Sequence, residues 1–111
     1  MIVIYSDVNP DFVVYKSDFA TTVKEAVEEA VKLGVNLEMS NLSGEDLSGI
    51  NLQGAKLDYS NCNGANLAGT DLSRSSLIMA DFSNCNLSNT NFRGTNTLDA
   101  KFDNTHGAWK V

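Results

Sequence analysis

A hydrophobic residue recurs at every fifth position through most of the chain. Residues 35–104 divide into 14 consecutive units of five residues with no insertion, such as ANLAG at residues 65–69. The third position of these units is Leu nine times and Phe three times, with Cys62 and Thr97 as the two exceptions. The first position is mostly small, the second is mostly Asn or Asp, and the fifth is often Gly. The pattern is therefore one large apolar residue per unit, surrounded by small and polar residues.

A period of five fits neither regular element. On an α-helix five residues advance about 500°, so the leucines would spiral around every side. On a flat strand successive leucines would alternate between the two faces, because five is odd. The chain must therefore turn once in each unit if all third positions are to point inward, and Asn, Asp and Gly supply the turn chemistry. We expect Leu47, Leu67 and Leu87 to stack above one another inside a coil.

The residues before the repeat predict a helix and a hairpin. Thr22 and Glu25 form a T-x-x-E capping box at the start of a helix over Thr22–Leu33, and Gly34 suits its end. The helix carries one apolar stripe at helical spacing: Val23, Ala26, Val27, Ala30 and Val31. We expect this stripe to close the N-terminal end of the coil, with partner binding as the alternative. Runs at residues 2–5 and 12–15, joined by a turn-rich link, predict a β-hairpin that leans on the helix or the coil.

The units resemble the pentapeptide-repeat family, whose consensus is A(D/N)LXX. The matching triplets include ANL at residues 65–67, TDL at residues 70–72 and ADF at residues 80–82. The resemblance implies a right-handed quadrilateral β-helix with four units per coil, hence about 3.5 coils and a height of about 17 Å. Two units depart from the pattern: Glu45 stands where a small residue is usual, and Thr97 replaces the inward Leu. We expect Glu45 to point into the N-terminal cap and the last coil to be distorted at Thr97.

The expected fold class is thus an all-β solenoid, a right-handed quadrilateral β-helix of about 3.5 coils, preceded by a β-hairpin and a capping α-helix. We expect three parts in the chain: the hairpin and helix at residues 1–34, the repeat at residues 35–104, and a C-terminal tail or cap at residues 105–111. The order of hairpin, helix and repeat resembles that of small pentapeptide-repeat proteins of bacteriophages and bacteria.

If four units make a coil, residues 20 apart share one side, and one outer column is apolar. The fifth positions Met39, Tyr59 and Met79 follow one another there, with Ile78 and Leu98 beside them. Contiguous exposed apolar surface usually marks an interaction site, and Met suits adaptable binding. Three interpretations are open: the hairpin folds over this face, a partner or second copy binds it, or the residues form no coherent patch.

The C-terminal end carries two aromatic residues, Phe102 and Trp109. They can cap the coil. They can also join two molecules end to end, because the family resemblance implies dimerisation through this end. Both interpretations are kept.

Composition narrows the chemistry. Eight Lys and Arg residues against 14 Asp and Glu residues give a net charge of −6, which argues against direct nucleic-acid binding because phosphates need a cationic surface. No run is long enough to span a membrane, and the first residues do not form a signal peptide, so we expect a cytoplasmic protein of a bacterial cell or its phage. Cys62 and Cys85 have no histidine neighbours and are interpreted as small buried hydrophobes. We expect no metal and no cofactor.

These observations predict a non-enzymatic protein. The single His lies near the C-terminus and no nucleophile–base arrangement is present. In the fold that the resemblance implies, side chains fill the coil and leave no substrate cavity. The leading hypothesis is a protein-interaction module, for example a phage or bacterial inhibitor of host restriction or CRISPR machinery. The family resemblance also suggests a DNA mimic that binds a topoisomerase such as gyrase. However, residues 35–104 carry eight acidic and four basic residues, whereas duplex DNA of about 17 Å carries roughly ten charges. A purely structural scaffold is the third hypothesis.

Overall fold

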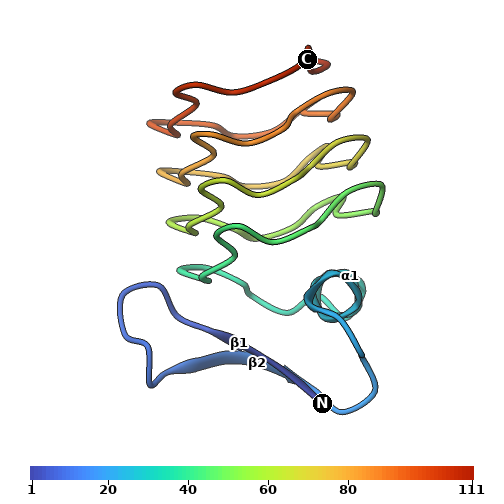
Figure 1. Ribbon diagram of the computed structural model, residues 1–111, viewed down its shortest axis with the longest axis vertical. Coiled ribbons are helices and arrows are strands. Elements are labelled where there is room, and N and C mark those ends of the chain that lie inside the picture. The colour runs from blue at the N-terminus through green and yellow to red at the C-terminus, as the bar shows by residue number, and fades with distance from the viewer.

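The computed structural model describes all 111 residues. Strands β1 (Ile2–Tyr5) and β2 (Val13–Ser17) form an antiparallel hairpin, helix α1 (Val23–Lys32) follows, and the rest of the chain rises in stacked coils (Figure 1). The N-terminal elements lie at one end of the stack and the C-terminus lies at the other.

The chain pairs with itself at a spacing of 20 residues throughout the stack. Parallel single-residue bridges join Asn41 to Asn61, and Asn61 in turn to Asp81. Each bridge is part of a hydrogen-bond ladder, in which the N–H of Leu42 donates to the carbonyl of Asn61 at 2.8 Å and the N–H of Asn61 donates to the carbonyl of Ser40 at 2.9 Å. This spacing agrees with four units per coil. Regular strands occur only in the hairpin, because each unit is extended at one residue and turns immediately afterwards.

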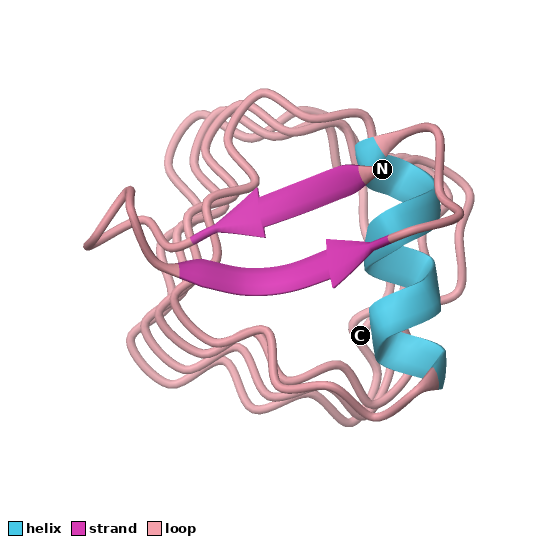
Figure 2. Cartoon of the chain, turned by 90° about the horizontal axis from the view of Figure 1, so that it is seen from below, coloured by secondary structure: helices cyan, strands magenta, loops and turns pink.

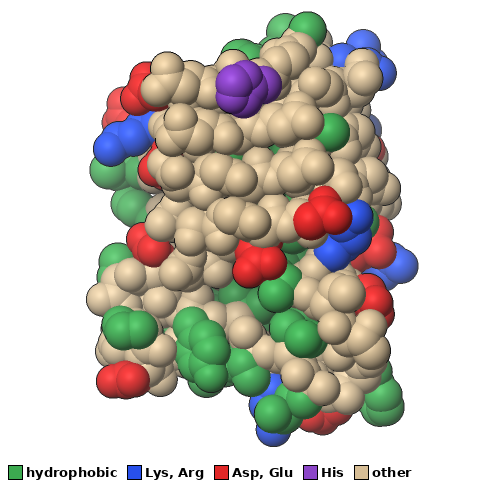
Figure 3. Space-filling view, viewed as in Figure 1, with side chains coloured by type: hydrophobic (Ala, Val, Ile, Leu, Met, Phe, Trp, Pro, Cys, Tyr) green, Lys and Arg blue, Asp and Glu red, His purple; other side chains and the backbone are tan.

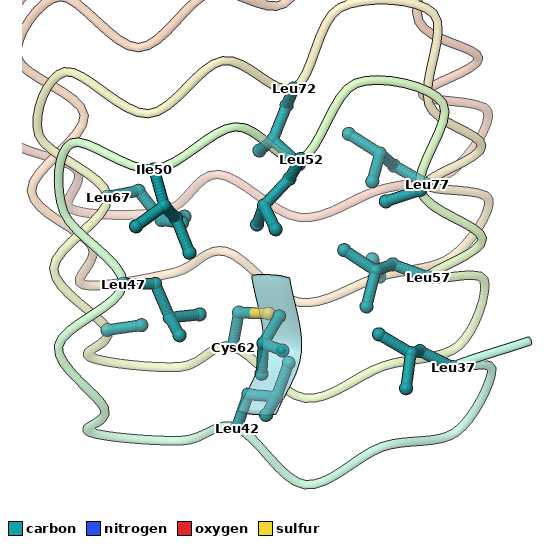
Figure 4. Packing of buried hydrophobic residues seen from close by; sticks show 14 of the residues in the cluster. Leu37, Leu42, Leu47, Ile50, Leu52, Leu57, Cys62, Leu67, Leu72 and Leu77 are labelled. Carbon is teal, nitrogen blue, oxygen red and sulfur yellow. The ribbon is translucent and has the colours of Figure 1, made fainter. Parts of the chain in front are cut away.

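The inward leucines form the core, as the five-residue period predicts. All nine Leu residues at third positions are buried, Phe82 and Phe92 are buried with them, and Phe102 is half-buried at the C-terminal end. Figure 4 shows the leucines from Leu37 to Leu77 pointing into the interior of successive coils. The N–H of Leu47 bonds the carbonyl of Asn66 and the N–H of Leu67 bonds that of Asn86, so the expected stacking of Leu47, Leu67 and Leu87 is confirmed.

The Asn and Asp residues at second positions fix the turns. In each case a side-chain oxygen accepts the N–H two residues later, as for Asn66 and the N–H of Ala68 at 3.0 Å. Eleven residues make this bond: Asn36, Asn41, Asp46, Asn51, Asn61, Asn66, Asp71, Asp81, Asn86, Asn91 and Asn96. Such Asx turns substitute for a backbone turn, so these polar residues are structural.

The last coil is regular at Thr97, and the expected distortion there is wrong. The N–H of Ala100 still donates to the carbonyl of Thr97 at 3.0 Å, and the N–H of Met79 still reaches the carbonyl of Leu98. Thr97 is exposed because no coil lies above it, so it leaves no gap in a closed core. The pairing also continues beyond Asn104, with bridges from Asn86 to His106 and from Asn91 to Lys110.

Helix α1 begins where the sequence predicts. The side chain of Thr22 accepts the N–H of Glu25 at 3.1 Å, and Gly34 follows the helix with a φ of +71°. Its stripe residues Ala26, Val27 and Ala30 are buried in the same core as the leucines. The hydroxyl of Tyr15 in β2 donates to Glu29 at 2.5 Å, which fixes the hairpin against the helix and raises the pKa of Tyr15 to about 12.

The hairpin and the helix share the task of closing the N-terminal end of the stack. Figure 2 shows the hairpin crossing this end while α1 lies along one side. The carbonyl of Tyr5 accepts the N–H of Asn41 at 2.8 Å, and a carboxylate oxygen of Glu28 accepts the N–H of Asn51 at 3.0 Å. Both acceptors take the place of a preceding coil, so the cap that was expected from the helix alone comes from both elements.

Replacing Glu28 with Ala should destabilise this end of the stack. The N–H of Asn51 loses its only protein acceptor, and a net loss of about 1 kcal/mol in the free energy of unfolding is expected. Urea unfolding measures it. Glu45→Ala is the matched control, because the carboxylate of Glu45 has no hydrogen-bond partner in the protein. Equal losses in the two variants would show that Glu28 does not act as a cap.

Candidate functional site

The apolar column predicted from the sequence forms on one corner of the stack. The N–H groups of Met39, Tyr59 and Met79 donate to carbonyls of the next coil at 2.9, 2.8 and 2.8 Å, which fixes the three residues on successive rungs. Their side chains and that of Leu98 are between 40% and 62% exposed, while Ile78 is half-buried beside them. We call Met39, Tyr59, Ile78, Met79 and Leu98 the apolar column.

Three residues of the column have an unfavourable backbone conformation. Met39 and Tyr59 have φ of 61° and Met79 has φ of 57°, in the left-handed region. Large side chains rarely adopt this region, which costs them about 1–2 kcal/mol, whereas Gly enters it freely. Most other corners of the stack carry Gly, Asn or Asp at the same position, and Arg74 is the one further exception. The three apolar residues therefore occupy positions where Gly would favour folding.

The hairpin turn reaches only the N-terminal end of the column. The N–H of Asp7 donates to the carbonyl of Met39 at 2.7 Å, and Asp7 also accepts the side-chain amide of Asn61 at 3.0 Å. Tyr59, Met79 and Leu98 remain exposed beyond it. The side chain of Tyr15, which could have covered Tyr59, bonds Glu29 on the helix instead.

Between the hairpin and the first coil lies an open groove of about 540 Å³. Its polar lining includes Asn36 and Glu38. The space-filling view shows hydrophobic atoms gathered over the end of the molecule that carries the hairpin (Figure 3). Five apolar residues line the groove: Val8, Phe12, Val13, Val14 and Met39. Met39 belongs to both features, so the apolar column opens directly into the groove.

The sequence indicated the column but not the groove. Phe12 was assigned to a strand, and Val8 lies in a link that reads only as a turn. The one indication of the groove in the sequence was the presence of two apolar residues, Val8 and Phe12, in a short polar segment where exposed apolar residues have no structural purpose. The position of the turn against residues 36–39 is a tertiary contact that no periodicity reveals.

The acidic residues lie on all four sides of the stack. With a period of 20, the eight carboxylates of the repeat fall on every side, including Glu38, Asp71 and Asp81 on three different ones. Several are engaged in turns, and hydrogen bonds from Ser48 lower the pKa of Asp46 below its usual range. A surface that imitates DNA would gather free carboxylates along one face, and this arrangement is absent.

The C-terminal end is covered by an aromatic cluster. Phe102 stacks between Phe82 and Trp109, with ring centroids 5.6 and 5.8 Å away. Phe92 meets all three rings edge to face. These contacts place Phe102 and Trp109 over the core, as a cap requires. Contact with a second copy through the same end stays a prediction.

The two cysteines lie inside the coil. Cys62 and Cys85 are buried and unpaired, and the thiol of Cys85 contacts the carbonyl oxygen of Cys62 at 2.9 Å. Burial raises the pKa of Cys62 to about 12 and that of Cys85 to about 11, so neither is a reactive thiolate at neutral pH. Their interpretation as small core residues is confirmed.

No group of three or more His, Cys, Asp and Glu side chains is arranged to hold a metal ion. None of the helices has the length and apolar character needed to cross a membrane.

Comparison with known proteins agrees with this architecture. A family model described as pentapeptide repeats matches residues 34–61, 46–84 and 80–106, in 8 copies. The chain belongs to the pentapeptide repeat family. Members of this family fold as right-handed quadrilateral β-helices and are in general non-enzymatic structural or interaction modules. A comparison with curated proteins finds no match.

The solved structure of a plant protein supports the same fold. A pentapeptide repeat protein from the thylakoid lumen of Arabidopsis thaliana is similar at 24% identity and a TM-score of 0.53, over 70% of this chain and 53% of that one. This chain thus spans about half the length of the Arabidopsis protein. A pentapeptide repeat protein from Nostoc Pcc 7120 is 28% identical over 78% of this chain and 84% of that one, with a TM-score of 0.43.

Proposed function

We propose that this protein is a binding module that recognises a protein partner through the apolar column, on a right-handed quadrilateral β-helix. The observation that carries the proposal is the left-handed conformation of Met39, Tyr59 and Met79. Strained residues persist where their side chains serve a purpose that a strain-free residue cannot serve. These side chains add nothing to the core, so binding is the purpose that the structure supports best.

The column has the properties of a docking strip. It is contiguous, rigidly spaced by the backbone ladder, and flanked by polar side chains such as Asp58. The carboxylate of Asp58 is itself fixed, because it accepts the hydroxyl of Ser76 at 2.6 Å and the N–H of Ile78 at 2.9 Å. An apolar strip with preorganised polar edges loses little conformational entropy on binding.

As the partner we propose a host protein that the module inhibits, such as a component of restriction or CRISPR machinery. The net charge of −6 supports a module that resists non-specific association and does not compete for nucleic acid. The spread of carboxylates over all four sides gives no support to a DNA mimic that binds gyrase.

Glycine substitutions in the column test the proposal. Tyr59→Gly and Met79→Gly keep the left-handed conformation but remove its strain, because Gly adopts it freely. The free energy of unfolding of each variant should equal that of the unmodified protein or exceed it by up to about 1 kcal/mol. Capture of partner proteins from a bacterial lysate, quantified by mass spectrometry, should nevertheless be lost. Retained capture at the level of the unmodified protein would refute binding through the column.

Arg74→Gly is the matched control. Arg74 has the same φ of 61° on another corner of the stack, so its replacement should change stability similarly and leave capture intact. Capture at low and high salt adds a second criterion. Apolar docking should persist at high salt, whereas binding by a charged mimic should fall steeply as counterions screen it.

A further inference from the structure

The groove beside the hairpin has an unpaired strand edge along one wall. Strand β2 has β1 as its only sheet neighbour, and no hydrogen bond joins its outer edge to the coil. Val13 and Val14, at the start of β2, line the groove. Figure 2 shows β2 crossing the end of the stack with no further strand beside it. An unpaired edge of this kind is a template for the main chain of another segment.

The opposite wall also has unused main-chain groups. In the third and fourth coils the N–H at the position of Asn36 bonds the preceding coil, as for Ser76 with Ala55 at 2.9 Å and Asn96 with Ser75 at 3.0 Å, whereas the N–H of Lys56 in the second coil makes no such bond. The N–H of Asn36 has no backbone acceptor either. The wall of the groove opposite β2 therefore offers at least one free main-chain donor, the N–H of Asn36.

The lining defines what such a segment must contain. Five apolar side chains line the groove, and Phe12 among them is 61% exposed. The one charged residue of the lining is Glu38, and neither Lys nor Arg is present to neutralise it. Asp7 and Asp11 lie in the adjoining hairpin turn. The complementary ligand is extended, apolar and basic.

We propose that the groove binds an extended segment of a partner protein, which adds as a strand along the open edge of β2. The segment places apolar side chains against Phe12 and Met39 and a Lys or Arg beside Glu38. Main-chain hydrogen bonds supply affinity and the lining supplies selectivity, as in other cases of strand addition. This inference rests on the proposed binding function and gives that function a second contact surface with a defined ligand chemistry.

Selection from a displayed library of random twelve-residue linear peptides tests the inference. The selected peptides should combine apolar residues with Lys or Arg. Phe12→Ser and Glu38→Lys should each weaken their binding about tenfold or more, which fluorescence anisotropy measures. The controls are Phe19→Ser and Glu45→Lys, because Phe19 is 89% exposed and both residues lie outside the groove. All four sites are at least partly exposed, so the variants should stay folded.

A second measurement separates strand addition from unspecific apolar contact. A selected peptide resynthesised with alternate amides N-methylated keeps its side chains but loses half of its main-chain donors, and it should bind about tenfold more weakly or worse. Equal binding of the methylated peptide would overturn strand addition. A library that yields no peptide sensitive to Phe12→Ser would overturn the groove as a peptide site. Self-association abolished by Phe12→Ser would assign the groove to a second copy instead.

The two proposals fail separately. If no groove-dependent peptide is found while partner capture still depends on Tyr59 and Met79, the groove inference is wrong and the column stands. If Tyr59→Gly and Met79→Gly leave capture unchanged, the proposed function through the column is wrong whatever the peptides show. Selected peptides should bind the Met79→Gly variant normally, because Met79 lies outside the groove.

Discussion

Leu67→Asp should abolish folding. Leu67 is 1% exposed in the middle of the stack. Its N–H donates to the carbonyl of Asn86, and its carbonyl accepts the N–H of Thr70. The substitution removes a buried apolar side chain and places a carboxyl group among leucines where no polar partner can reach it. The combined cost is on the order of 5 kcal/mol or more, which equals the entire stability of many small domains. Circular dichroism and thermal unfolding measure the result.

Asn63→Ala is the control for that variant. Asn63 is four residues from Leu67 but points outward, with side-chain contacts to Asp81 at 3.3 Å and Asn84 at 3.4 Å. Its loss should cost no more than about 1 kcal/mol. A folded Leu67→Asp protein of native thermal stability would contradict a core built from third positions.

Phe82→Ala should produce the second-largest effect, with a loss of about 3–5 kcal/mol in the free energy of unfolding. Phe82 is fully buried, stacks on Phe102 at 5.6 Å and meets Phe92 edge to face at 6.0 Å. Its removal leaves a cavity beneath the aromatic cluster that the ladder above cannot close, because the backbone spacing is fixed by hydrogen bonds. Equilibrium unfolding in urea gives the value.

Phe102→Ala provides the comparison along the same stack. Phe102 is half-buried beneath Trp109, so its truncation opens a space that solvent can reach and should cost less than the loss of Phe82. If Phe102→Ala were the more damaging of the two, the aromatic cap would contribute more to stability than the core.

The core could be predicted from the sequence because the repeat overdetermines it. One inward residue per turn is the only solution to a period of five, and Leu37 through Leu87 repeat that signal many times. The structure at the C-terminal end of the stack was harder to predict. A distorted coil was expected at Thr97 because this residue replaces the inward Leu, but Thr97 lies exposed in the final coil, where no further coil packs on it. The regular turn persists there because Asn96 still makes its Asx bond to Leu98.

Only one of the two surface features of the candidate site, the apolar column, could be predicted from the sequence. The column is a consequence of periodicity, so Met39, Tyr59 and Met79 could be grouped once four units were assigned to a coil. The groove depends on how a non-repeating hairpin turn packs against the first coil. The closing role of Glu28 was equally hidden, since a carboxylate that replaces a carbonyl leaves no pattern in the sequence.

Each coil pairs only with the coil directly above it and the coil directly below it. The groove lies at the N-terminal end of the stack and the aromatic cluster lies at the C-terminal end. A whole turn of 20 residues can therefore be inserted or removed in the middle with both ends unchanged, because each rung contacts only its neighbours. Every added turn would contribute one further corner residue in line with Tyr59 and Met79. In this architecture the length of the apolar column is an evolutionary variable of its own, which can increase by gene duplication without redesign of the fold.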